Sequence, residues 1–195
     1  LITPYYNKPT QEGLYQHYKA ISEATTVPIV LYNVPPRTGC DMHAETVARL
    51  ANFSNIVGIK DACGDAKRIT GIKSVLTGPA QDDFFLLSGE DAQTLEMMTL
   101  GAAGTISVTA NVLPELMSEF CTSYLKGDHE HARKLDARLQ PVHDALFVES
   151  SPTPTKWILS ELGRMQGGIR LPLIPLSAQH HETVRDAVTT AGAAK

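Results

Sequence analysis

The sequence predicts an α/β protein built on a parallel sheet, and three observations support this. Apolar, β-branched segments alternate with helix-like segments along the 195 residues. No two of the strand-like segments are joined by a hairpin turn, so neighbouring strands are expected to run parallel. The segments are apolar almost throughout, which is typical of strands covered on both faces. We expect strands at residues 1–3, 28–33, 55–60, 84–88 and 104–108.

Helical patterns and loops fill the intervals between these strands. Thr10 is placed to cap a helix over residues 11–24. Val34-Pro35-Pro36 interrupts the chain after the second strand, so Arg37 is expected in a proline-framed loop. Residues 167–177 are rich in proline and leucine and are expected to be extended. The other predicted helices cover residues 43–52, 65–76, 91–100, 114–126, 129–147, 155–162 and 182–191.

Two architectures fit this alternation: an open doubly wound sheet and a (β/α)8 barrel. No glycine fingerprint for a dinucleotide follows any strand. A full barrel typically needs ~250 residues, and the strand-like segment 1–3 begins with Leu1, so we expect a preceding segment. On the barrel interpretation, residues 1–127 form strands four to eight, about the last five βα units. Residues 128–195 then form a C-terminal helical region.

Composition narrows the class of protein. The hydrophobic share of 43% and the charged share of 19% are ordinary for a globular domain. The net charge of -4 argues against a nucleic-acid partner, and no apolar run is long enough to span a membrane. The three cysteines lack metal-type spacing and no secretory signal is visible, which favours reduced thiols in a cytoplasmic protein. The histidines have no third ligand at an informative spacing, so we expect no metal.

Lys60 is the most informative residue, because it ends the apolar run Asn55-Ile56-Val57-Gly58-Ile59. Burial disfavours the charged form of a lysine and lowers its pKa. A neutral amine can attack a ketone and form a Schiff base. The alternative is a lysine that only extends its charge to water from a strand end. The other lysines fall in predicted loops or helices or at the terminus, so none is expected to be strongly desolvated.

Other polar residues follow the predicted strand ends, where the active site of a parallel α/β protein is built. Tyr32 ends the second strand at the depth of Lys60 and is a candidate for proton transfer. Arg37 has the planar fork that suits a carboxylate. Tyr6 follows the first strand. Each also has a simpler interpretation: a packed tyrosine for Tyr32 and Tyr6, and a surface arginine for Arg37.

Several motifs, taken in order, resemble the dihydrodipicolinate synthase family of pyruvate-dependent class I aldolases. The resemblance covers essentially the whole chain and corresponds to the C-terminal two-thirds of the family's length. Any one motif is weak, but their order and spacing are specific. They are Thr3-Pro4-Tyr5-Tyr6-Asn7, Tyr32-Asn33-Val34-Pro35-Pro36-Arg37-Thr38-Gly39, Gly58-Ile59-Lys60-Asp61, Leu87-Ser88-Gly89 and Gly104-Thr105-Ile106-Ser107-Val108.

The resemblance implies a (β/α)8 barrel and a role for each site residue. Lys60 would form an imine with pyruvate, and Tyr32 would relay protons. Tyr6 would reach into the site of a partner subunit, so a dimer or a dimer of dimers would be functional. Arg37 would hold the carboxylate of L-aspartate-4-semialdehyde, and the pyruvate pocket would be lined by Gly89 and the backbone of Ile106.

The implied product is 4-hydroxy-tetrahydrodipicolinate, on the path to diaminopimelate and lysine, and no cofactor is implied. A sialic-acid (N-acetylneuraminate) lyase or another sugar-acid aldolase or dehydratase is the alternative enzyme, which the resemblance at Arg37 disfavours. A further alternative, from another class, is an inactive fragment or binding module, because the family's first three βα units and their Gly-Thr-Thr-Gly-Glu strand end are absent from the sequence.

Overall fold

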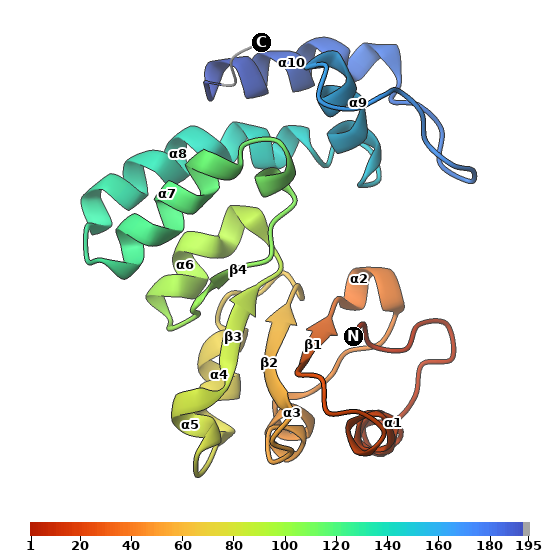
Figure 1. The fold of residues 1–195 in the computed structure, drawn as a ribbon, viewed down its shortest axis with the longest axis vertical. Coiled ribbons are helices and arrows are strands. Elements are labelled where there is room, and N and C mark those ends of the chain that lie inside the picture. The colour runs from red at the N-terminus through yellow and green to blue at the C-terminus, as the bar shows by residue number, and fades with distance from the viewer. Residues whose placement is uncertain (193–195) are drawn as a thin grey trace. The chain divides into compact units, whose positions relative to one another are not determined.

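The computed structural model describes residues 1–192 and divides them into two compact units, Leu1–Ile106 and a second unit that begins at Ser107. The first unit holds every strand found in residues 1–192 (Figure 1). Its elements are α1 (Gln11–Glu23), β1 (Ile29–Asn33), α2 (Pro35–Thr38), α3 (Ala44–Leu50), β2 (Ile56–Asp61), α4 (Arg68–Val75), α5 (Ala80–Asp83), β3 (Phe85–Ser88), η1 (Asp91–Gln93), α6 (Thr94–Thr99) and β4 (Gly104–Thr105).

The sheet is parallel throughout, in the order β1-β2-β3-β4, as the alternation of segments predicts. The three longer strands begin and end within one residue of the predicted positions. Their buried faces pack side chains such as Leu31, Ile59 and Leu86, each at most 4% exposed. Burial of each such side chain contributes roughly 1.5–3 kcal/mol, so these strands form the core of the unit.

The two terminal strands of the prediction are shorter than expected. Residues 1–3 form a single parallel bridge, between Ile2 and Tyr32, rather than a strand. Pro4 has no N–H to donate, which ends the ladder there. The predicted strand 104–108 ends at Thr105, although the Ile106 N–H still donates to the Ser88 carbonyl over 3.0 Å.

The helices follow the prediction with local differences. The Thr10 hydroxyl accepts from the Gly13 N–H at 3.1 Å, which confirms the predicted cap of α1. The prediction of a loop around Arg37 is wrong, because Pro35–Thr38 form one helical turn, α2. Proline suits the first turn of a helix, since its φ is already helical and its missing N–H is not needed there. The left-handed Gly39, with φ 66°, then ends the turn.

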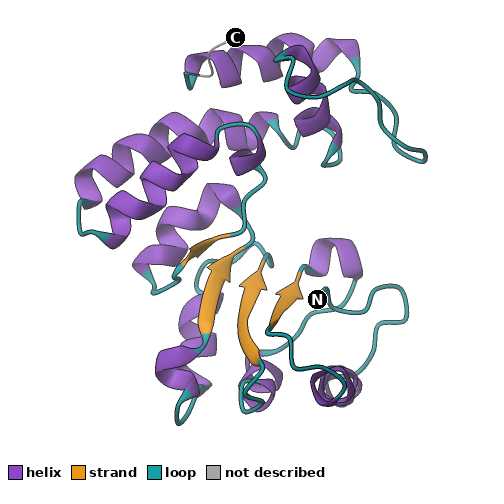
Figure 2. Ribbon diagram, in the orientation of Figure 1, coloured by secondary structure: helices purple, strands orange, loops and turns teal. Residues whose placement is uncertain are grey.

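The described part of the second unit, residues 107–192, contains helices and loops and no strand (Figure 2). Residues 164–177 have no helix and are mostly exposed, as predicted for the proline-rich segment. Across residues 1–192, no helix combines the length and the apolar character needed to cross a bilayer. The predicted domain boundary at 127/128 stays a prediction. The elements of this unit are η2 (Thr109–Asn111), α7 (Pro114–Leu125), α8 (His129–Ala145), α9 (Thr153–Glu161), η3 (Ala178–His180) and α10 (His181–Thr190).

Candidate active site

Lys60 and Tyr32 lie side by side at the carboxyl ends of β2 and β1. The two residues are partners in the parallel register, and the Lys60 Nζ lies 4.4 Å from the centre of the Tyr32 ring. Both side chains are half-buried. Lys60 is the one lysine among residues 1–192 that lies in a strand, and Lys195 falls outside the described residues. The structure therefore brings the predicted amine and the predicted phenol together.

Burial lowers the pKa of the Lys60 ammonium below its ordinary value. The nearby carboxylates of Asp91 and Glu90 oppose this effect without cancelling it. A lower pKa raises the fraction of free amine at neutral pH, which is the form that attacks a carbonyl.

The pKa of the Tyr32 phenol is shifted upward, in the opposite direction to that of Lys60. Burial raises its pKa, the charge of Arg37 lowers it by a smaller amount, and Glu90 raises it further. The phenol therefore keeps its proton at neutral pH and can donate it to an oxygen beside the Lys60 amine. The pair therefore sets an amine of lowered pKa beside a protonated phenol.

Glu90 is a neighbour of this pair that the sequence analysis did not single out. Burial raises the pKa of its carboxyl, and the charge of Asp91 adds to the shift, while Lys60 and Arg37 oppose it. The carboxyl thus lies within electrostatic range of both Lys60 and Arg37. The sequence could have indicated Glu90 as a site residue, because it follows Gly89 at the end of β3 and active-site residues lie at these strand ends.

The other predicted side chains are held less closely. Arg37 is exposed on α2, and its charge acts on Tyr32 and Glu90. Tyr6 is 87% exposed and has a φ of 71°. Within the described residues its side chain makes no hydrogen bond or ring contact, so the structure does not bring it to Lys60 or Tyr32.

Gly89 packs directly against the stem of Lys60. Its N–H donates to the Asp61 carbonyl over 2.7 Å. A Cβ at this position would lie 2.7 Å from the Cβ of Ala62 and 3.0 Å from the Cε of Lys60. Ile106, the other predicted pocket residue, is 47% exposed and its N–H is already bonded to Ser88.

A buried polar network lies directly behind the pair, and the sequence analysis missed it. Asn33 and Asp61 follow Tyr32 and Lys60 in their strands and are themselves register partners. The Asn33 amide donates to the Asp61 carboxylate over 2.9 Å. Arg68, at the start of α4, lies 3.9 Å from the same carboxylate. The signal in the sequence was a polar residue immediately after each of two site residues on neighbouring strands.

The chain matches the model of the dihydrodipicolinate synthetase family over residues 1–191. It belongs to this family. A 4-hydroxy-tetrahydrodipicolinate synthase from Pseudomonas savastanoi pv. phaseolicola is 51% identical over 192 residues, which cover 98% of the chain and 64% of the relative. The chain thus spans about 64% of the length of the curated relatives it matches.

Two solved structures of the family superpose closely. A chloride-inhibited dihydrodipicolinate synthase from Acinetobacter baumannii, complexed with pyruvate, matches with a TM-score of 0.91 and 51% identity over 98% of the chain and 65% of that structure. A monomeric dihydrodipicolinate synthase variant matches with a TM-score of 0.94 and 46% identity over 98% and 64%. The fold class is confirmed, and the parallel sheet is part of a (β/α)8 barrel.

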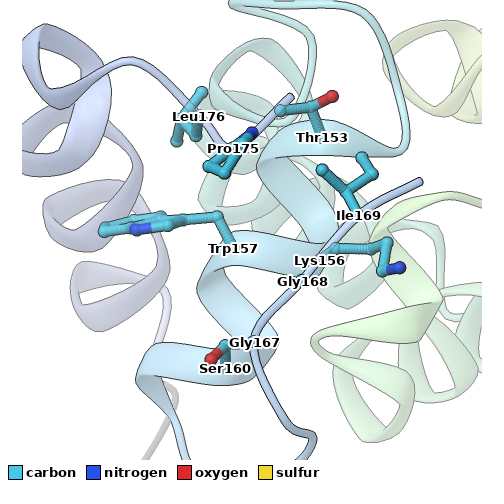
Figure 3. Close-up of a pocket in the computed structure, with 9 residues that line it drawn as sticks. All are labelled: Thr153, Lys156, Trp157, Ser160, Gly167, Gly168, Ile169, Pro175 and Leu176. Carbon is cyan, nitrogen blue, oxygen red and sulfur yellow. The ribbon is translucent and has the colours of Figure 1, made fainter. Parts of the chain in front are cut away.

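The second unit has a pocket of its own, between α9 and the segment that follows it (Figure 3). Trp157 and Lys156 leave α9 in opposite directions there. None of the predicted site residues lines this pocket. Within residues 1–192, no group of three or more His, Cys, Asp or Glu side chains is arranged to hold a metal ion.

Proposed function

We propose that the protein is a Schiff-base-forming lyase that condenses pyruvate with L-aspartate-4-semialdehyde to give 4-hydroxy-tetrahydrodipicolinate. The observation that carries the proposal is the half-buried amine of Lys60, 4.4 Å from the Tyr32 ring at the carboxyl ends of two parallel strands. The names of the relatives, 4-hydroxy-tetrahydrodipicolinate synthases, support the product. The family resemblance implies the substrate pair and a place in diaminopimelate and lysine biosynthesis.

In the first step the lone pair of the Lys60 amine attacks the keto carbon of pyruvate. The nitrogen loses a proton and the carbonyl oxygen takes one up, which gives a carbinolamine. A second protonation of this oxygen lets it leave as water. In this proposal the Tyr32 phenol, which keeps its proton at neutral pH, supplies a proton to this oxygen. The product is a protonated imine on Lys60.

The protonated imine then acts as the electron sink of the reaction. The methyl carbon of pyruvate loses a proton, and the electron pair moves toward the imine nitrogen to form an enamine. The enamine carbon attacks the aldehyde carbon of the second substrate and forms the new carbon–carbon bond, while the aldehyde oxygen takes up a proton to become the hydroxyl of the product and the imine of Lys60 is restored. The amine of the adduct closes the ring by attack on the imine carbon, which releases Lys60. No metal or organic cofactor is needed for these steps.

Arg37, Gly89 and Ile106 take the substrate-binding roles in this proposal. The guanidinium of Arg37 binds the carboxylate of the aldehyde substrate, and its exposure on α2 leaves the planar fork accessible. The tight packing of Gly89 on the Lys60 stem leaves no room for a larger residue where pyruvate would enter. The backbone of Ile106, beside Ser88, lines the same side.

We also propose that the protein self-associates as a dimer or a dimer of dimers, with Tyr6 completing the site of a partner subunit. Tyr6 and Tyr5 are 87% and 66% exposed, which suits residues that become covered in an assembly. The monomeric variant among the family's structures is the counterexample that makes this proposal worth testing.

A cytoplasmic location without membrane or nucleic-acid partners completes the proposal. The odd number of cysteines, Cys40, Cys63 and Cys121, and their lack of metal-type spacing are typical of reduced thiols in a cytoplasmic protein. The net charge of -4 does not favour binding to a polyanion.

Borohydride reduction tests the central step. With pyruvate present, borohydride should fix a pyruvate-derived adduct on Lys60 in the wild-type protein, found by mass spectrometry of its peptide. The Lys60→Ala protein should form none and should show no turnover, whereas Lys67→Ala, in the loop just after the strand, should behave as wild type. An adduct that persists in Lys60→Ala would refute the assignment.

The second substrate is tested separately. Turnover of pyruvate with aspartate semialdehyde supports the synthase. Turnover with N-acetylmannosamine instead would favour a sialic-acid lyase. Absence of any adduct would favour a non-catalytic module.

A further inference from the structure

Four polar residues form a connected network on the opposite face of β1 and β2 from the candidate site. Successive side chains of a strand point to opposite faces. Asn33 and Asp61 therefore point away from Tyr32 and Lys60, the residues just before them in the same strands. Asn33 is fully buried and Asp61 is 1% exposed, so neither can exchange its partners for water.

Asn33 uses all of its side-chain polar atoms in this network. Its Nδ2 donates to the Oδ2 of Asp61 over 2.9 Å and to the Oδ1 of Asp41 over 2.8 Å. Its Oδ1 accepts from the Met42 N–H over 3.0 Å. The amide thereby fixes the ends of both strands and the chain that follows α2.

Arg68 closes the network from α4. Its two terminal nitrogens donate to the two oxygens of Asp41 over 3.0 and 2.7 Å, and one of them also donates to the Met42 carbonyl. Its Nε lies 3.9 Å from the Asp61 carboxylate and is buried without a hydrogen-bond partner. This two-pronged pairing fixes the orientation of the guanidinium in a way that a point charge cannot.

The backbones of the same residues reach the site directly. The Asn33 carbonyl accepts from the Ala62 N–H over 2.9 Å, and the Asp61 carbonyl accepts from the Gly89 N–H over 2.7 Å. A shift of Asp61 therefore moves Lys60, its neighbour in the chain, and Gly89, which packs on the stem of Lys60.

Resting on the proposed function, we propose that Asp61, Arg68 and Asp41, connected through Asn33, are positioning residues that set the placement of the Lys60 amine against Tyr32. Charged residues are a costly way to hold two strands together, because buried charges lose favourable free energy of hydration. Well-packed apolar residues in the same place often give equal or greater stability. The network lies one residue beyond both Lys60 and Tyr32. Its directional hydrogen bonds can therefore fix the positions of these two residues, which non-directional apolar packing would not do.

The test compares two identical substitutions in the first unit. Arg68→Lys keeps the charge and removes the fork. Arg49→Lys does the same at the exposed ion pair between Arg49 on α3 and Glu12 on α1, whose contact of 2.9 Å lies on the surface. Both proteins are measured for turnover, thermal unfolding and the reactivity of Lys60.

Turnover should separate the two variants. A misplacement of about 1 Å of a reacting group can cost about 100-fold in rate, so kcat of Arg68→Lys should fall by up to this factor while KM for pyruvate changes little. Arg49→Lys should keep both constants. Asp41→Asn is the second variant, for use if Arg68→Lys does not fold. It replaces an oxygen that accepts hydrogen bonds from Arg68 and Asn33 by an N–H2 group that cannot accept them, so it should cause the same loss of kcat.

The pH dependence of Lys60 reactivity gives a readout that does not depend on turnover. Labelling of Lys60 by acetic anhydride is followed by mass spectrometry across pH, with a free amino acid as internal standard. Water admitted by a loosened strand end relieves the desolvation of the amine, so the labelling midpoint should rise toward that of an ordinary lysine. The groups that face Lys60, namely Tyr32, Glu90 and Asp91, are unchanged in the variant and cannot cause the rise.

The possible outcomes are distinct. A lower melting temperature with unchanged kcat and an unchanged labelling midpoint would overturn the positioning role and leave a stabilising one. A raised midpoint together with lost turnover supports it. If the wild-type protein forms no pyruvate adduct, the proposed function fails, whereas the labelling midpoint still decides whether the network places the amine.

Discussion

The two tyrosines predicted for the site, Tyr32 and Tyr6, are held in opposite ways. Tyr32 lies within the sheet: its N–H donates to the Leu1 carbonyl over 2.7 Å, its carbonyl accepts from Thr3 over 2.8 Å, and its ring faces Lys60. Tyr6 lies in a loop with a left-handed φ of 71°, and its ring is 87% exposed. The sheet fixes the first side chain, whereas nothing in the described residues fixes the second.

This difference shows which parts of the site the first unit determines by itself. Residues at strand ends inherit their positions from a ladder of backbone hydrogen bonds, so Lys60, Tyr32 and Gly89 come together within one unit. A loop residue such as Tyr6 acquires a defined position only when a second surface covers it. The strand-borne pair should therefore carry the chemistry of imine formation, and the loop residue should act only in an assembly.

Tyr32→Phe should produce the largest effect. Loss of a positioned proton donor typically lowers the rate by about 100-fold to 10,000-fold, and the phenyl ring keeps the packing against Lys60. We expect kcat to fall within this range, with a melting temperature close to that of wild type. Tyr15→Phe, on α1 beside Phe53, is the matched control. Equal activity of the two variants would remove Tyr32 from the proton relay.

Gly89→Ala should produce an intermediate effect, through packing. The new Cβ would lie 2.7 Å from that of Ala62 and 3.0 Å from the Cε of Lys60. Overpacking of this kind costs about 1–3 kcal/mol and displaces the lysine stem, so the free energy of unfolding and the rate of borohydride trapping should both fall.

Gly71→Ala is the control for this substitution. Gly71 lies within α4 and its Cβ would meet nothing within 4 Å. Alanine is the better helix former by roughly 0.5–1 kcal/mol, so this variant should gain stability and keep its trapping rate. Equilibrium unfolding in urea measures both changes. A Gly89→Ala protein as stable and as reactive as wild type would mean that the close contact with Lys60 has no consequence.

Much of the fold could be predicted from the sequence, because its signals are local. Short apolar runs, β-branched in β1 and β2 and rich in Phe and Leu in β3, predicted these three strands within one residue. The N-terminal cap of α1 could be predicted because it depends on one residue, Thr10, next to the helix. The short helix α2 was missed, because its two prolines also suit a loop. Arg37 therefore lies on a helical turn and not in the predicted loop.

The support of the site could not be predicted, since it depends on contacts between distant residues. Arg68 meets Asp41, 27 positions earlier, and Asn33 meets Asp61 across two strands. Either carboxylate, seen alone, is consistent with a solvated surface group. The pairing arises only when the sheet brings the strand ends together. The roles of Lys60, Tyr32, Tyr6, Arg37, Gly89 and Ile106 stay predictions until the variants are measured.

Tyr6→Phe should have the smallest effect on the unit itself. A single exposed hydroxyl contributes less than about 0.5 kcal/mol to the free energy of unfolding, so melting temperature and borohydride trapping at Lys60 should stay close to wild type. Turnover should nevertheless fall if Tyr6 completes the site of a partner subunit.

Complementation tests that role directly. Co-expression of Tyr6→Phe with the inactive Lys60→Ala protein places an intact Tyr6 beside an intact Lys60 in mixed assemblies. Activity above that of either variant alone therefore requires Tyr6 to act across subunits. If Tyr6 acted within its own chain, every site in the mixture would still lack one of the two groups and no activity would be recovered. Tyr5→Phe, altered at the neighbouring exposed ring, is the control that separates the relay from simple contact at the surface.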